Sequence, residues 1–169
     1  MAHWLIRLLK HRRFDEDDVA RVLPPAALAR IEARVKESEA RHGGEIRVAV
    51  EAGLPWSYLR RGATPRERAI AMFAKLGVWD TERDNGVLIY LLLAEHAIEI
   101  VADRGLNRHV DPAEWAAIAA TMQDAFRRGE FEAGIGRAID AVDALLVRHF
   151  GREGTDADHN ELPDAPHVG

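Results

Sequence analysis

The sequence of 169 residues contains no cysteine. This absence excludes disulfides, thiol nucleophiles, iron–sulfur clusters and cysteine-ligated zinc sites, so a bound metal would have to use histidine or oxygen ligands. Long hydrophobic runs are also missing, because no stretch approaches the ~20 apolar residues that a helix needs to span a bilayer. We therefore expect no transmembrane segment.

The N-terminal residues lack the pattern of a secretion signal. Residues 1–18 contain only a short apolar stretch, which Arg7 interrupts, and no small-residue cleavage site follows it. The expected location of the protein is therefore cytoplasmic.

The same N-terminal segment has an amphipathic pattern. Its apolar stripe comprises Trp4, Leu5, Leu8 and Leu9, and basic residues stand beside it. One interpretation is a short helix docked on the domain, and the other is peripheral membrane contact through residues 4–14. The docked helix is favoured because the stretch is brief and the acidic residues that follow would repel anionic lipid.

Basic residues are not in excess. The chain has 23 lysines and arginines against 28 aspartates and glutamates, for a formal net charge of -5. Proteins that bind phosphate backbones have a strongly basic surface, so nucleic acid is not an expected partner. A chain of this length with 47% hydrophobic residues is typical of a single globular core.

Periodicity and turn residues predict alternating helices and strands. Residues 45–51, 86–93 and 98–102 have the pattern of strands, and the second is so uniformly apolar that it favours a central strand covered on both faces. Helices are predicted over residues 26–41, 65–76, 112–128 and 131–150. Thr64 and Glu67 match a capping box at the start of the second helix.

The order of these elements predicts one α/β domain over residues 26–150. An N-terminal helical extension, residues 1–25, precedes it, and a disordered tail, residues 151–169, follows it. The helical connection makes the first two strands parallel, and the short turn makes the second and third strands a β-hairpin. We therefore predict a three-layer α/β/α sandwich with a mixed central sheet.

This topology brings oxygen-bearing side chains to one end of the sheet, where Glu45, the loop 80–85 and the turn 103–105 are expected to be neighbours. The candidate metal ligands are Asp80, Asp84, Asn85 and Asp103. Oxygen ligands on loops suit a hard divalent cation, calcium in particular, which is the expected cofactor. The alternative is that these residues form turns and cap the strands, with Asp103 paired to a neighbouring arginine. The loop matches no EF-hand pattern, so both interpretations stay open.

Four short segments of the sequence form recognisable motifs. They are Gly44-Glu45-Ile46, the helix end Phe73…Leu76-Gly77, the segment Asp84-Asn85-Gly86-Val87-Leu88-Ile89, and the pattern Phe-Arg-x-Gly-x-Phe at Phe126–Phe131. These motifs are similar to those of the TPM-domain family. The resemblance spans roughly residues 27–150. The family includes thylakoid-lumen photosystem-repair proteins and many bacterial proteins, and this chain looks like a short, soluble subgroup of it.

The resemblance implies an α/β/α sandwich, calcium binding in some members and a weak acid-phosphatase activity in plant relatives. It implies metal ligands at Asp84 and Asn85 and, through a looser match, at Asp80. Asp103 rests on the predicted geometry alone. The residues Ala102-Asp103-Arg104-Gly105 depart from the family pattern, in which an apolar strand is followed by Gly-x-Gly.

The expected function is that of a divalent-cation-binding module, a binding or adaptor domain with an unknown protein partner. The alternative is a weak metal-dependent acid phosphatase, a phosphomonoesterase, in which Arg83 and Arg104 would hold the phosphate charge. No motif marks a committed active site, so the catalytic residues stay unassigned. Trp56 and Tyr58, before the second predicted helix, either form an exposed patch for a partner or pack internally.

Overall fold

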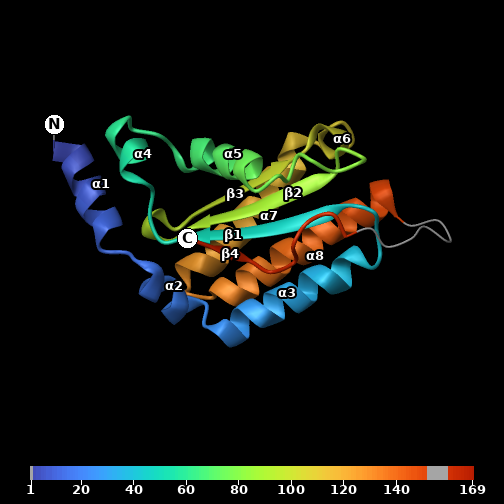
Figure 1. Cartoon of the computed structure of the whole chain (residues 1–169), viewed down its shortest axis with the longest axis horizontal. Coiled ribbons are helices and arrows are strands. Elements are labelled where there is room, and N and C mark those ends of the chain that lie inside the picture. The colour runs from blue at the N-terminus through green and yellow to red at the C-terminus, as the bar shows by residue number, and fades with distance from the viewer. Residues whose placement is uncertain (1, 152–159) are drawn as a thin grey trace.

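The structure, a computed structural model, describes residues 2–151 and 160–169, with side chains from Leu5 onward. In chain order the elements are α1 (Ala2–Arg12), α2 (Glu16–Val22), α3 (Pro25–Glu39), β1 (Glu45–Glu51), α4 (Trp56–Arg60), α5 (Pro65–Lys75), β2 (Gly86–Leu92), the 3-10 turn η1 (Leu93–Glu95), β3 (Ala97–Ala102), α6 (Arg104–Asn107), α7 (Pro112–Arg127), α8 (Phe131–Phe150) and β4 (His167–Val168). Figure 1 shows the helices arranged around one sheet.

A mixed sheet with the strand order β3-β2-β1-β4 forms the centre of the domain. β1 and β2 run parallel, with Glu45 opposite Gly86 and Glu51 opposite Leu92. β2 and β3 run antiparallel, and His96 closes the turn between them in the left-handed conformation. The predicted parallel pair and the predicted hairpin are both confirmed.

Helices cover both faces of the sheet (Figure 1). One core cluster lies between the sheet and α3, α7 and α8, and Ile46 and Val48 of β1 belong to it. The other cluster lies under α5, where Leu88 and Tyr90 of β2 pack with Met72. Because both faces are packed, every residue of β2 is buried. The fold is the α/β/α sandwich that the sequence predicts.

Local capping signals position the helices as predicted. At the start of α5 the Thr64 side chain accepts a hydrogen bond from the Glu67 backbone N–H, and the Glu67 carboxylate accepts one from the Thr64 N–H at 2.7 Å. Gly77 and Gly129, which follow α5 and α7, have φ angles of 69° and 75°. Residues with a Cβ are strained in this left-handed region, so glycine is suited to end both helices there.

The N-terminal extension packs against the domain as two helices. α2, which the sequence analysis did not predict, begins at a capping box centred on Asp15. Val19 of α2 and the following Leu23 are buried in the main core. α1 is attached to the η1 turn by an ion pair between Arg7 and Glu95. The extension therefore contributes to the core of the domain.

Part of the tail that the sequence predicts to be disordered, residues 151–169, is ordered in the structure. Residues 160–169 run along the sheet, and β4 pairs in parallel with β1. Leu162 is buried, and the Gly169 N–H donates to the Val50 carbonyl of β1, while its carbonyl accepts the N–H of Ala52, just after β1. The prediction of disorder is wrong for this part because backbone pairing with an open strand edge needs no apolar periodicity in the added segment. Residues 152–159 lie outside the described part of the chain.

The longest helix is α8, with 20 residues, and charged side chains such as Asp140 and Arg148 lie on its exposed face. None of the helices in the described part of the chain combines the length and the apolar content that crossing a membrane requires.

Candidate functional site

Three segments that are far apart in the sequence meet at one end of the sheet. Glu45, the first residue of β1, lies opposite Gly86, the first residue of β2. The backbone N–H of Asp103, directly after β3, donates to the Gly86 carbonyl at 2.9 Å. The Gly105 N–H donates to the Asp84 carbonyl, also at 2.9 Å. The structure thus brings these segments together as the topology predicts, and we call this region, around Glu45, Gly86 and Asp103, the acidic end of the sheet.

Two glycines allow the segments of the acidic end to approach each other closely. A Cβ on Gly86 would collide with the carbonyl oxygen of Val78, and a Cβ on Gly105 would collide with the Asp84 carbonyl oxygen. Both obstacles are backbone atoms, which cannot rotate away. Asp84 has a φ of 52°, in the left-handed region that aspartate and asparagine enter more readily than most residues. The Asp-Asn-Gly motif therefore has a structural role in the tight entry to β2.

Asn85 has no exposed surface. Its side-chain amide donates to the Gly43 carbonyl at 2.7 Å, and its backbone N–H donates to the Thr81 hydroxyl at 3.1 Å. The side-chain oxygen Oδ1 is buried and has no hydrogen-bond partner among the described residues. Such a buried acceptor is uncommon in folded proteins, and a bound ion or water is a frequent explanation.

The three predicted aspartates have different surroundings. The Asp84 carboxylate pairs with Nε of Arg104 at 3.0 Å in a largely exposed ion pair. Oδ1 of Asp103 accepts the backbone N–H of Arg104 at 2.6 Å and so caps α6, whereas its Oδ2 is buried and unpartnered in the described part of the chain. Asp80 is exposed on the loop before β2. The contacts of Asp84 and Asp103 match the interpretation as turn and cap residues, and they leave one buried oxygen on Asp103.

No three histidine, aspartate or glutamate side chains within residues 2–151 and 160–169 are grouped closely enough to hold a metal ion. Two features nevertheless fit an oxygen-ligated cation. They are the buried, unpartnered oxygens of Asn85 and Asp103, and the Asp84 carboxylate that precedes Asn85 in the chain. Metal binding by Asp80, Asp84, Asn85 and Asp103 stays a prediction.

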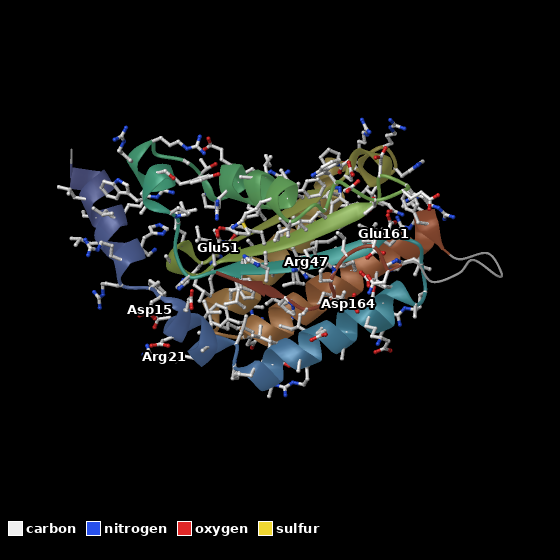
Figure 2. The ribbon with its side chains drawn as sticks, in the orientation of Figure 1. Asp15, Arg21, Arg47, Glu51, Glu161 and Asp164 are labelled. Atoms are coloured by element: carbon white, nitrogen blue, oxygen red, sulfur yellow. The ribbon has the colours of Figure 1, made fainter. Side chains whose placement is uncertain are left out.

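Two further glutamates are buried beside the start of β1. Glu39, the last residue of α3, is 8% exposed, and its Oε1 accepts a backbone N–H of β1 at 2.8 Å. Glu45 is 4% exposed and accepts the backbone N–H groups of Glu161 and Leu162 at 3.1 and 3.3 Å. These last two bonds hold the C-terminal segment against the acidic end, where Figure 2 labels Glu161 and Asp164.

Burial changes the protonation of both glutamates. It is the main cause that raises the pKa of Glu39 to about 9, with a further contribution from the carboxylates of Glu45 and Asp164. Burial likewise raises the pKa of Glu45 to about 7, although the hydrogen bonds from Glu161 and Leu162 oppose this shift. At neutral pH Glu39 is therefore protonated, while Glu45 is close to its titration midpoint.

Arg47 attaches the C-terminal segment to β1. Its guanidinium donates to the carbonyls of Pro163 and Ala165, and burial lowers the pKa of this arginine. The sequence analysis missed this part of the site because its signals are single residues. Leu162, an isolated apolar residue within a polar stretch, is the one feature that could have indicated docking of the segment.

A serine, a histidine and an aspartate are also in contact between α3 and α8. Their hydrogen bonds do not form a catalytic triad, in which the histidine would act as the base for the serine. The Ser38 hydroxyl donates to Asp143 at 2.8 Å and lies 3.0 Å from Nε2 of His42. Nδ1 of His42 accepts the Gly44 backbone N–H at 3.1 Å, so in the neutral ring Nε2 carries the proton and cannot act as a base toward the hydroxyl. His42 is 0% exposed, which closes the group to substrates. The three side chains thus have a structural role and link α3 to α8.

Comparison with known protein families identifies the family to which this fold belongs. Residues 17–145 match the family model TPM_phosphatase, described as the TPM domain. The chain belongs to the TPM domain family. The matched range begins within α2 and ends within α8, so it includes β1, β2 and β3. Curated proteins give no significant sequence match.

Solved structures share the fold of this TPM domain. The NMR structure of the BA42 protein from the psychrophilic bacterium Bizionia argentinensis has 27% sequence identity and a TM-score of 0.74, and the match covers 85% of this chain and 93% of that chain. The solution NMR structure of the N-terminal domain of a protein from P. gingivalis has 19% identity and a TM-score of 0.62, with coverage of 79% and 84%. The second likeness concerns the fold alone.

Proposed function

We propose that this TPM domain is a binding module that takes up a divalent cation, calcium above all, at the acidic end of its sheet. The observation that carries the proposal is the fully buried Asn85, whose Oδ1 has no hydrogen-bond partner in the described structure. Removing a polar oxygen from water without a replacement partner is costly, and a cation supplies such a partner.

The other oxygens of the acidic end support the same proposal. Oδ2 of Asp103 is a second buried oxygen that no described donor contacts, and Asp84 supplies a carboxylate next to Asn85. Calcium prefers oxygen ligands from carboxylates, amides, backbone carbonyls and water, arranged flexibly. Asp80 adds an exposed carboxylate on the same loop.

Arg104 forms an ion pair with the Asp84 carboxylate. The side chains of this ion pair are 73% and 38% exposed, respectively. An exposed ion pair stabilises a protein by only about 0–1 kcal/mol, so a doubly charged ion can displace the arginine at small cost. We therefore propose that Asp84 exchanges between Arg104 and the cation.

Thermal unfolding in increasing calcium, and separately in magnesium, tests the proposal. An ion present at about ten times its Kd adds about 1.4 kcal/mol to the free energy of unfolding. For a domain of this size the melting temperature then rises by about 3–6 °C.

The matched variants are Asp84→Ala and Asp124→Ala. Asp124 forms a comparable exposed ion pair with Arg127 on α7, so its removal should leave the rise intact, whereas Asp84→Ala should abolish it. An equal rise in both variants would refute the assigned position of the site. No rise in the wild type with either ion would refute cation binding.

A phosphomonoesterase is the second candidate function. The name of the matched family model and the position of Arg104 beside Asp84 favour it, since metal-dependent phosphate hydrolysis needs a cation and a cationic side chain that holds the phosphate charge. A chromogenic phosphate ester distinguishes the two candidates. Metal-dependent turnover that disappears in Asp84→Ala and Arg104→Met would support the enzyme, and stabilisation by the metal without turnover would support the binding module.

A further inference from the structure

Two polar side chains of helix α1, Arg7 and His11, point toward the protein. Nδ1 of His11 accepts the backbone N–H of Leu54 at 2.9 Å, and its Nε2 lies 2.8 Å from Oε1 of Glu95. Arg7 donates to the same carboxylate at 2.6 Å and to the Ala63 carbonyl at 2.6 Å. His11 is only 4% exposed, so this inner face is anchored by specific polar contacts rather than by apolar packing alone.

The opposite face of α1 is apolar and exposed. Leu5, Ile6 and Leu9 are 46%, 62% and 62% exposed, and we call these three residues the outer face of α1. At about 3.6 residues per turn, Leu5 and Leu9 lie one turn apart on the same side, opposite the side that carries Arg7 and His11. An ordinary surface helix buries its apolar stripe, whereas α1 leaves these three apolar side chains exposed and packs only Leu8 in part against the core.

A tryptophan is also exposed on the helix that packs beside α1. Trp56 of α4 is 55% exposed, and α4 packs beside α1 at the same end of the molecule (Figure 1). Four of the eight large hydrophobic side chains that are exposed in the described part of the chain therefore belong to α1 and α4. Tryptophan at the edge of an apolar surface is typical of the boundary between lipid and water.

Cationic side chains surround the outer face. Residues 1–13 contain no aspartate or glutamate, although the whole chain has a net charge of -5. Lys10, Arg12 and Arg13 are exposed, and Lys10 and Arg13 line a surface hollow together with Ile6, Leu9, Phe14 and one acidic residue, Asp18. Apolar side chains and positive charge are thus concentrated on one small surface.

We propose that the outer face of α1, with Trp56, binds the surface of a bilayer that contains anionic phospholipid. The apolar side chains enter the boundary between headgroups and acyl chains, and Lys10, Arg12 and Arg13 bind the negatively charged headgroups. A second copy of the chain is a poorer occupant, because symmetric contact between two such helices places the same cationic clusters against each other.

The acidic residues that follow α1 are partly compensated within α2. Asp15 and Asp18 accept each other's backbone N–H groups in the capping box, and the Asp18 carboxylate pairs with Arg21 at 2.6 Å. Glu16 and Asp17 remain exposed beside the cations, and they limit the depth and the strength of binding. The contact is therefore reversible and sensitive to salt.

Co-sedimentation with vesicles tests this proposal. The full chain should bind vesicles of phosphatidylcholine mixed with phosphatidylglycerol, and should bind pure phosphatidylcholine vesicles much less. Each removed cation lowers the partition coefficient roughly fivefold, so Lys10→Gln with Arg13→Gln lowers it about 30-fold. The double variant Ile6→Ser with Leu9→Ser should also abolish binding.

Ile70→Ser is the matched control, because Ile70 on α5 is 50% exposed and lies outside the outer face of α1. This variant should bind as the wild type does. Circular dichroism confirms that each variant is folded, and the charge variant, which removes no apolar side chain, provides a second test if the serine variant unfolds.

Two results would overturn the proposal. One is a wild-type chain that does not bind anionic vesicles, or binds them equally well with and without Ile6 and Leu9. The other is a concentration-dependent dimer that the serine variant dissociates, with no binding to vesicles, which would identify a second copy of the chain as the occupant.

Discussion

The two ends of β1 each carry a buried glutamate, and the two glutamates have different partners. Glu45 begins the strand and Glu51 ends it, at 4% and 5% exposure. Glu51 receives two hydrogen bonds from the Arg68 guanidinium, at 2.8 and 2.5 Å, and a third from the Tyr90 hydroxyl at 2.7 Å. The hydrogen bonds to Glu45 within the described structure come from backbone N–H groups of the C-terminal segment.

From the different surroundings of Glu45 and Glu51 we expect a proton or a cation to bind at one end of β1 rather than at the other. At the Glu51 end, an arginine already compensates the buried carboxylate, as a buried charge requires. At the acidic end, Glu39 and Glu45 have raised pKa values, and buried oxygens of Asn85 and Asp103 are unpartnered within the described part. Figure 2 places the labels of Glu51 and Glu161 toward opposite ends of the sheet. We therefore expect protons to titrate, and a cation to bind, at the acidic end.

We expect the largest change in the free energy of unfolding from Arg68→Met. This substitution leaves Glu51 without an arginine partner, as Glu45 is at the acidic end within the described part of the chain. Removing one member of a buried ion pair leaves the other charge without compensation, and we expect a loss of about 3–5 kcal/mol in the free energy of unfolding. Urea unfolding measures this loss. Arg60→Met, on the exposed surface of α4, is the control and should change the free energy by less than about 0.5 kcal/mol. Equal effects of the two substitutions would contradict the contrast between the ends.

The next effect concerns the close packing of the acidic end. Gly86→Ala places a Cβ against the Val78 carbonyl oxygen and should destabilise the domain by about 1–3 kcal/mol. Gly136→Ala is the control, because the atoms nearest to its Cβ belong to the flexible end of the Arg34 side chain. Alanine also has a higher helix propensity than glycine within α8. Chemical unfolding should therefore show a clearly lower stability for Gly86→Ala than for Gly136→Ala. Similar stabilities would contradict the close packing at the start of β2.

Glu39 imposes a pH dependence on the free energy of unfolding, an effect that accumulates over several pH units and is not seen in full at any single pH. Its pKa is about 9 in the folded chain and 4.5 when unperturbed, so between these values the folded state holds a proton that the unfolded state releases. This contribution to stability is fully present below about pH 4.5 and is lost as the pH rises toward 9, at a rate of up to about 1.4 kcal/mol per pH unit.

Urea unfolding at a series of pH values between 5 and 9 measures the contribution of Glu39. Glu39→Gln should flatten the decline in stability, whereas Glu37→Gln, on an exposed position of the same helix, should preserve it. Identical pH profiles for the two variants would show that Glu39 is not the group that titrates.

The smallest effect is expected from Arg104→Met. Its exposed ion pair with Asp84 contributes at most about 1 kcal/mol, so the free energy of unfolding should change by less than that amount. If Arg104 competes with a cation for Asp84, the same variant should bind calcium more tightly than the wild type. Calorimetric titration measures this affinity, and weaker binding by the variant would contradict the proposed exchange.

The strands and capped helices could be predicted because their signals are local. Thr64 and Glu67 are three residues apart, and the apolar run from Gly86 to Leu92 indicates a central strand on its own. The topology then follows from the lengths of the connections. For the same reason the meeting of the loop before β2 with the turn after β3 could be predicted from the sequence.

The features that escaped prediction depend on contacts between distant residues. β4 has two residues and is attached by backbone pairing to β1, and the Arg47 guanidinium holds the segment that precedes it; no local pattern indicates either contact. The sequence places Asp84 near Arg104, but it cannot show whether a carboxylate pairs with an arginine or binds a cation, because that depends on side-chain competition. The attachment of α1 through its polar side chains likewise depends on Glu95, more than eighty residues from His11.

A calcium titration followed residue by residue in two-dimensional amide NMR tests the central claim most directly. If the acidic end binds the cation, the largest shifts will occur at Asp84, Asn85 and Asp103, they will saturate together, and Asp84→Ala will remove them. Saturable shifts that occur elsewhere while these three amides stay unchanged, or no saturable shifts at all, would contradict the account.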